Sequence, residues 1–147
     1  MMINSFENYL KFGKAKRKTP DPQESESLIK KSINRLEYTK EKTITEKNAD
    51  FVLEDAYESM REAAQALMSI KGFKPYSHEA TISFISDHHK NDFGEADIRM
   101  LDHFRQLRND SVYKAIIITV DDAKSCISFA ESFIRKIKLI LAKECTK

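Results

Sequence analysis

The stretch ADFVLEDAYESMREAAQALMSIKG, residues 49–72, decides the fold class. Its apolar residues recur at steps of three and four, which is the period of one face of an α-helix. They are Val52, Ala56, Met60, Ala63, Leu67 and Ile70. Gly72 follows the last of them, where a helix commonly ends. Because several of the residues are alanines, a neighbouring helix can approach closely. The stretch predicts a long helix over residues 49–70.

Helical periodicity also lies on both sides of this stretch. A short amphipathic piece around Phe6 and Leu10 precedes a break at residues 19–27. Ser77 is placed to be the N-cap of a helix that ends near the turn at 91–94. The predicted longer helices cover residues 23–42, 49–70, 78–90, 95–107 and 123–141. We therefore predict an all-α, up-and-down bundle of four to five helices.

The stretch AIIITV, residues 115–120, is β-branched and resembles a strand. No second candidate strand is evident, and a lone strand has nothing to pair with. We therefore predict a buried, extended connector. Thr119 and Asp122 have the spacing of a capping box, so the last helix is expected to begin directly after Thr119.

Length and composition exclude several classes of protein. The chain has 147 residues, with 3 Gly, 3 Pro and 2 Cys. That length suits one domain, and so few turn residues argue against an all-β fold. Two cysteines frame no disulfide scaffold, and no stretch is long and apolar enough for a membrane span or a signal peptide. We expect a cytoplasmic protein with no membrane partner.

Charge is unevenly distributed along the chain. Residues 1–22 carry five basic side chains against two acidic ones, and residues 135–147 carry five against one. Basic segments of this kind either contact nucleic acid or keep the chain soluble, and both interpretations stay open. We divide the chain into a basic N-terminal arm with a short helix, residues 1–22, and a helical bundle, residues 23–147.

The histidines form no recognisable metal site. His88 and His89 are adjacent, so on a helix they point about 100° apart and do not share one ion easily. We expect them, with Asp87, to be surface polar residues, and His103 to be structural. Glycine-rich phosphate loops are absent from the sequence. We predict no metal and no cofactor.

The segment FRQLRNDSVYK, residues 104–114, is the strongest chemical candidate. Arg105 and Arg108 are expected at or near the end of a helix, where a guanidinium group either clamps a phosphate or forms a salt bridge. Acidic residues of the helix over 49–70 are available for that salt bridge: Glu54, Asp55, Glu58 and Glu62.

Four stretches together resemble the HEPN domain family, named for nucleotide binding in higher eukaryotes and prokaryotes. They are SLIKKSINRLEYTKE, DAYESMREAAQALMSIKGFKPYSHEATISFI, LRNDSVYK and VDDAKSCISFAESFIRKI, and the resemblance runs from about Ser25 to Leu141. It implies a helical bundle that dimerises, with a site at the dimer interface. In many members an Arg, a polar residue and a His at that site cleave RNA without a metal ion.

Arg108 and Asn109 match the first two positions of that motif, and Tyr113 stands where those members carry His. A tyrosine, with a reference pKa of about 10, is a poor general base near neutral pH. The resemblance thus implies a catalytic set of Arg108, Asn109 and Tyr113 with weak or no ribonuclease activity. It also implies phosphate or nucleotide binding by Arg108, with Arg105 and Glu58. Because Glu58 follows Tyr57 on the matching stretch, we expect it to be the acid that pairs with Arg108, with Asp55 as the next candidate.

Two function classes remain open at this point. The first is an RNA- or nucleotide-binding protein of HEPN type, a toxin-like member of a toxin–antitoxin pair with weak or degenerate metal-independent ribonuclease activity. The second is a non-catalytic helical homodimer that docks a minimal nucleotidyltransferase. Both partners, the second copy and the nucleotidyltransferase, are implied by the resemblance.

Overall fold

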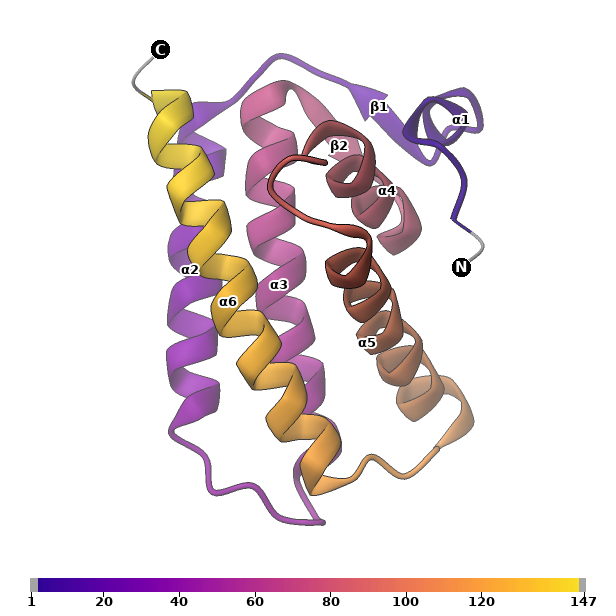
Figure 1. Ribbon diagram of the computed structural model, residues 1–147, viewed down its shortest axis with the longest axis vertical. Coiled ribbons are helices and arrows are strands. Elements are labelled where there is room, and N and C mark those ends of the chain that lie inside the picture. The colour runs from indigo at the N-terminus through magenta and orange to yellow at the C-terminus, as the bar shows by residue number, and fades with distance from the viewer. Residues whose placement is uncertain (1–2, 146–147) are drawn as a thin grey trace.

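A computed structural model describes residues 3–145, which form six helices and one pair of short strands (Figure 1). The elements are α1 (Phe6–Lys11), β1 (Ala15–Arg17), α2 (Pro22–Lys40), α3 (Ala49–Lys71), β2 (Phe73–Pro75), α4 (His78–His88), α5 (Glu95–Lys114) and α6 (Val120–Cys145). The predicted all-α bundle is confirmed. None of the described helices is long and apolar enough to cross a membrane.

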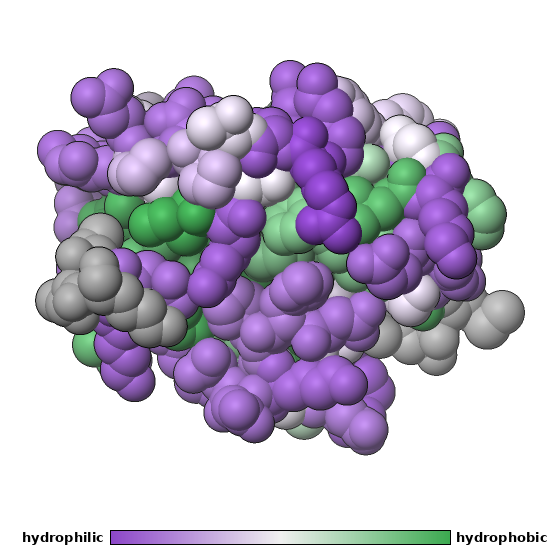
Figure 2. Space-filling view, turned by 90° about the horizontal axis from the view of Figure 1, so that it is seen from above, coloured by the Kyte–Doolittle hydropathy of each residue, from purple (hydrophilic) through white to green (hydrophobic). Residues whose placement is uncertain are grey.

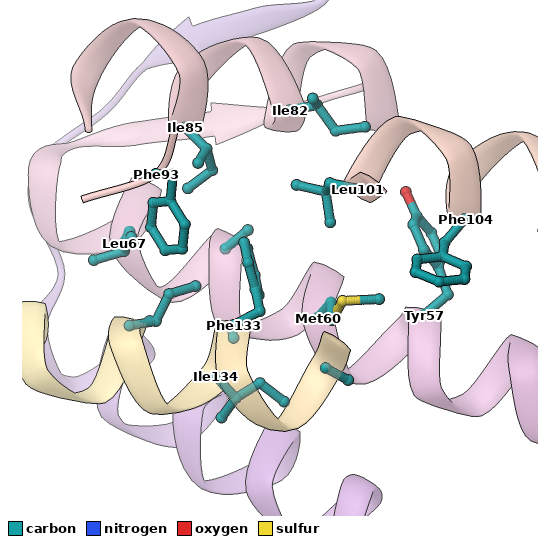
Figure 3. Close-up of a cluster of buried hydrophobic side chains, with 14 of the residues drawn as sticks. Tyr57, Met60, Leu67, Ile82, Ile85, Phe93, Leu101, Phe104, Phe133 and Ile134 are labelled. Atoms are coloured by element: carbon teal, nitrogen blue, oxygen red, sulfur yellow. The ribbon is translucent and has the colours of Figure 1, made fainter. Parts of the chain in front are cut away.

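Helix α3 is the centre of the bundle. It packs against α2 and α6 on one side and against α4 and α5 on the other (Figure 1). Side chains from α3, α4, α5 and α6 meet in one hydrophobic core, in which Met60, Leu67 and Phe104 are fully buried (Figure 3). The apolar face predicted from residues 49–72 is therefore only part of the surface that α3 buries.

Close approach of α2 to α3 follows from small side chains on α3. Ala56, Ala63 and Ala66 are completely buried. The hydroxyl group of Ser32 donates to the carbonyl oxygen of Ser59 at 2.5 Å, and that of Ser25 donates to the carbonyl oxygen of Ala66 at 2.8 Å. Short serines bonded directly to the neighbouring backbone require two helices that lie almost in contact.

The expectation that no strands pair is wrong. β1 and β2 form a two-stranded antiparallel sheet in which Lys16 is opposite Lys74. The pairing was missed because each strand has three residues and β1 lies in a polar segment without alternating apolar residues. The sheet brings the N-terminal segment onto the bundle, where Phe6 contacts Phe73 and Phe84 edge-on at centroid distances of 5.2 and 5.4 Å.

At the end of α4, Asp87 and His88 are exposed as predicted, whereas the prediction is wrong for His89, which is buried. His89 is 7% exposed, and the ring of His88 stacks on Phe84 at a centroid distance of 4.6 Å. Asp87 accepts a hydrogen bond from the backbone nitrogen of Phe6 at 2.8 Å. Phe6 of α1 makes the contacts with Asp87 and His88, because α1 packs against α4.

The connector between α5 and α6 differs from its prediction in two ways. Helix α5 continues to Lys114, seven residues beyond its expected end, and stops where Ala115 takes a left-handed conformation with φ of 53°. Only Ile118 of the three isoleucines is buried, whereas Ile117 is 86% exposed. Because the connector is short and joined to a helix at each end, it can turn only one of these side chains into the core. The Thr119–Asp122 capping box is confirmed by two reciprocal hydrogen bonds of 3.1 and 3.0 Å.

Gly72 fixes the junction between α3 and β2, because its φ is +87° and an added Cβ would lie 2.7 Å from the carbonyl oxygen of Lys18. Gly13 has a φ of +74° but open space around it. We expect Gly13→Ala to lower the free energy of unfolding by about 1–2 kcal/mol, the cost of left-handed backbone. Gly72→Ala is expected to cost clearly more, since the Lys18 backbone must also move. Urea unfolding of both variants measures this, and equal losses would contradict the steric argument.

Candidate functional site

Arg105 is fixed between two helices by carboxylates. Its Nη1 donates to Oε1 of Glu79 and its Nε donates to Oδ1 of Asp102, each at 2.8 Å. The Arg105 side chain is only 14% exposed, and Asp102 is 3% exposed as a residue. These contacts favour the salt-bridge interpretation for Arg105, which connects α5 to the start of α4.

Arg108 lies one turn further along α5 and is held differently. Its Nη1 donates to Oδ1 of Asn109 at 3.2 Å. Among residues 3–145, no carboxylate lies within 4.0 Å of its guanidinium group in an ion pair, although the side chain is half-buried. Because α5 extends to Lys114, Arg108 lies within the helix and not at its end. Within residues 3–145, the one side-chain hydrogen bond of the Arg108 guanidinium group is the one to Asn109.

Tyr113 is 77% exposed. It is four residues after Asn109, so both lie on the same face of α5, while Arg108 points to a different part of that surface. In the part of the chain that the structure describes, no hydrogen bond holds the Tyr113 hydroxyl group. The side chain of Asn109 therefore contacts that of Arg108, whereas the side chain of Tyr113 makes no hydrogen bond to it.

The predicted pairing of Glu58 with Arg108 is wrong. Glu58 forms a two-pronged ion pair with Arg61, one turn later on α3, in which Nε of Arg61 lies 2.9 Å from Oε2 and Nη2 contacts Oε1. Burial favours a raised pKa for Glu58, but the hydrogen bond and charge of Arg61 outweigh it and lower the pKa. A neighbour three residues away on the same helix reaches Glu58 more easily than a side chain on another helix.

Glu54 is the α3 acid whose ionisation Arg108 influences. Burial and the nearby charge of Asp50 raise the pKa of Glu54, and the positive charge of Arg108 opposes them. Arg108 thus faces α3 near Glu54 without forming a direct ion pair there.

Tyr57 and His78 form a stacked pair beside these arginines. The Tyr57 hydroxyl oxygen lies 3.3 Å from Nδ1 of His78, and the ring centroids are 5.7 Å apart. Tyr57 extends from α3 towards Phe104 of α5 (Figure 3) and is 3% exposed. Its burial raises its pKa well above the ordinary tyrosine value, so the phenol stays protonated. His78 is the first residue of α4, directly after the N-cap Ser77.

Two arginines act on the protonation of His78. Its pKa lies below the ordinary value because burial and the positive charges of Arg61 and Arg108 disfavour the imidazolium form; Glu58 and Glu79 oppose them in part. His78 is therefore neutral at neutral pH and can accept a proton. We call the group formed by Tyr57, Arg61, His78 and Arg108 the arginine–histidine cluster.

Sequence reasoning singled out Arg108 and missed the importance of Arg61 and His78. In the sequence, His78 stands out only as a member of the HEPN-like stretch. The one local feature that marks it is its position directly after the predicted N-cap Ser77. Its proximity to Arg108 arises from the packing of α4 between α3 and α5, which no local pattern encodes.

Other surfaces of the described chain offer less chemistry. A groove of about 400 Å³ between α2 and α6 is lined mainly by apolar residues, among them Ile29, Ile33 and Leu141. None of the residues of the arginine–histidine cluster lines it. Across residues 3–145, no group of three or more His, Cys, Asp or Glu side chains is placed to hold a metal ion.

Comparison with known proteins identifies one family. A family model described as HEPN domain matches residues 25–140, from the first turns of α2 to the last part of α6. The matched range includes the whole arginine–histidine cluster and leaves out α1 and β1. No curated protein and no solved structure gives a significant match.

The charge of Arg108 provides a test of the cluster's geometry. We expect Arg108→Gln to raise the pKa of His78 towards its ordinary value, because one of the charges that disfavour the imidazolium form is removed. An NMR titration of the His78 ring resonances measures this. Arg99→Gln, on an exposed turn of the same helix, serves as the control and should leave the pKa unchanged. An unchanged value in Arg108→Gln would place Arg108 outside the cluster.

Proposed function

Because the chain belongs to the HEPN domain family, we propose that it is an RNA- or nucleotide-binding protein whose phosphate site is the arginine–histidine cluster. The observation that carries the proposal is Arg108, a half-buried arginine with no ion-pair partner within 4.0 Å in residues 3–145, next to a second arginine and a neutral histidine. A half-buried guanidinium group without a direct ion-pair partner is well placed to receive an anion.

The neighbours of Arg108 suit a phosphate group. Arg61 is oriented by Glu58 and by Gln65, whose Oε1 accepts from Nη1 of Arg61 at 2.9 Å. His78 lies at the N-terminus of α4, where the helix dipole favours negative charge. Arg61 and Arg108 come from different helices, so a phosphate between them would receive donors from two directions. Such charge-assisted hydrogen bonds are about twice as strong as neutral ones.

The cluster also supports weak ribonuclease activity that needs no metal ion. RNA cleavage of this type begins when a base takes the proton of a 2′-hydroxyl group. The 2′-oxygen then forms a bond to the adjacent phosphorus, and the 5′-oxygen leaves with a proton from water. His78 is neutral and half-buried, and therefore fits the role of base better than Tyr113, which nothing orients.

A second copy of the chain is the partner we propose on structural grounds. Large apolar side chains are exposed near the end of α5 and after it: Val112, Tyr113, Ile116 and Ile117. Ile116 and Ile117 line a surface hollow together with Asp50 of α3. Contiguous exposed apolar residues of this kind usually mark an interface. A homodimer joined there would bring Tyr113 of each copy beside the other copy.

The apolar groove between α2 and α6, which lies outside the proposed dimer patch, supports the second candidate, a non-catalytic dimer that docks a minimal nucleotidyltransferase. A member of a toxin–antitoxin pair would need such a surface for its partner. The two candidates share a fold and differ in whether the arginine–histidine cluster binds and cleaves RNA.

Removal of the Arg108 guanidinium group tests phosphate binding. We expect Arg108→Ala to weaken binding of uridine 5′-monophosphate at least tenfold, because a hydrogen bond to a charged group contributes about 1.5–3 kcal/mol. Isothermal titration calorimetry measures the change. Arg99→Ala removes the same charge from an exposed position on α5 and should bind like the wild type. Binding by Arg108→Ala within twofold of wild type would reduce Arg108 to a structural residue.

A cleavage assay in EDTA separates the two candidates. With an oligoribonucleotide substrate, we expect slow wild-type cleavage to 2′,3′-cyclic phosphate ends, a loss of at least 100-fold in His78→Ala, and little change in Tyr113→Phe. Tyr113→His should increase the rate only if the second copy brings residue 113 to a cluster, because within one copy Tyr113 lies away from Arg108. No cleavage by wild type or Tyr113→His would favour the docking module, and cleavage unaffected by His78→Ala would show that another residue is the base.

A further inference from the structure

The two-stranded sheet presents lysines and a tyrosine on one face. Lys16 is opposite Lys74, and the backbone nitrogen of Tyr76 donates to the carbonyl oxygen of Lys14 at 2.8 Å. Since side chains alternate along a strand, residues two apart share a face. The lysine–tyrosine face therefore consists of Lys14, Lys16, Lys74 and Tyr76, all of them exposed.

The lysines of this face form no ion pair with an acidic side chain of the described residues. Two lysines directly opposite each other on paired strands destabilise a sheet by repulsion. The nearby acids are used elsewhere: Glu7 pairs with Arg17, and Glu24 pairs with Lys18. In residues 3–145, no ion pair within 4.0 Å involves Lys14, Lys16 or Lys74. An external anion would relieve this repulsion.

Tyr76 adds an exposed ring between these charges. It is 52% exposed, and the ammonium groups of Lys16 and Lys74 lie 6.0 and 5.7 Å from its ring centroid. Figure 2 looks down on the end of the molecule that carries β1 and shows hydrophilic residues over most of it. An aromatic ring flanked by cations in such a surface has the composition of a nucleotide-stacking platform, with a ring for a base and ammonium groups for the adjoining phosphates.

We propose that the lysine–tyrosine face binds single-stranded RNA, with one base stacked on Tyr76 and the neighbouring phosphates held by Lys16 and Lys74. Tyr76 precedes His78 by two residues, so the backbone positions of the face and of the arginine–histidine cluster are at most about 7 Å apart at this point. The two sites are therefore adjacent in the chain at this point, and the proposal extends one strand across both. The inference deepens the proposed function, on which it rests, by making a single strand the ligand of the combined surface.

A single strand fits the face better than a duplex does. A base must leave its own stack to lie on an aromatic side chain, and duplex bases are already stacked on both sides. We expect the face to bind RNA without sequence specificity. It offers one ring and flexible ammonium groups, and no rigid set of donors and acceptors that could distinguish one base from another. An anionic membrane surface would be attracted by the lysines but gives Tyr76 no base to stack on.

Fluorescence anisotropy with a labelled 12-nucleotide oligouridylate tests the proposal. We expect the double variant Lys16→Ala/Lys74→Ala to weaken binding about tenfold and to reduce the slope of log K against log salt by about 1.4, the value for two phosphate contacts on a single strand. Lys124→Ala/Lys138→Ala is the matched control, because it removes the same charge from exposed positions on α6 and should change neither quantity.

Tyr76 variants separate stacking from charge. Tyr76→Ala is expected to weaken oligouridylate binding at least fivefold, and Tyr76→Phe to keep it, since phenylalanine retains the ring. A 12-base-pair RNA duplex should be insensitive to Tyr76→Ala. Equal losses in both double-lysine variants, or no difference between Tyr76→Ala and Tyr76→Phe, would overturn the proposal. So would binding to phosphatidylserine vesicles that requires Tyr76 while oligouridylate binding does not.

Failure of this inference is distinguishable from failure of the proposed function. Uridine 5′-monophosphate carries one phosphate, which a half-buried guanidinium group binds more strongly than ammonium groups on an exposed face, so its binding should depend on Arg108 more than on Lys16 or Lys74. Normal oligouridylate binding by the double-lysine variant, together with loss of mononucleotide binding in Arg108→Ala, would remove the lysine–tyrosine face and leave the cluster. Thermal melting by circular dichroism verifies that each variant is folded.

Discussion

The burial of α3 on nearly all sides is the constraint on which the rest of the structure depends. A helix in that position must provide partners for every polar side chain it carries. Glu62, 2% exposed, is neutralised by Arg35 of α2 at 2.8 Å, and Glu58 is neutralised by Arg61. Tyr57 reaches His78. The polar residues of α3 thus determine which neighbours surround it, and they leave the region around Arg108 positively charged.

That positive region is an electrostatic consequence of the packing. α5 contributes Arg105 and Arg108 one turn apart, and Asp102 and Glu79 satisfy the first of them. The second remains close to Arg61 and keeps His78 neutral. Glu58 offsets the charge of Arg61, but burial of Arg108 beside an imidazole, with no ion-pair partner within 4.0 Å in residues 3–145, costs stability unless an anion offsets its charge. We interpret this cost as the physical reason for ligand binding at the arginine–histidine cluster.

Local patterns predicted the helices well and the site only in part. The period of residues 49–72, the Ser77 N-cap and the Thr119–Asp122 capping box are local features, and each appears as expected. The partner of Glu58, the burial of His89 and the β1–β2 pairing depend on residues far apart in sequence. No periodicity contains that information. The HEPN-like motif likewise drew attention to Arg108 and Tyr113 on one helix and away from His78, which packing brings from another.

The most direct test of the account is to observe where a small RNA fragment binds. NMR spectra of the protein with side-chain labels on arginine and histidine, titrated with a uridine trinucleotide, report each group separately. The account predicts that the resonances of Arg61, Arg108 and His78 shift together with one dissociation constant, while those of Arg35 and Arg99 stay in place. Shifts confined to other arginines, with His78 unaffected, would contradict it.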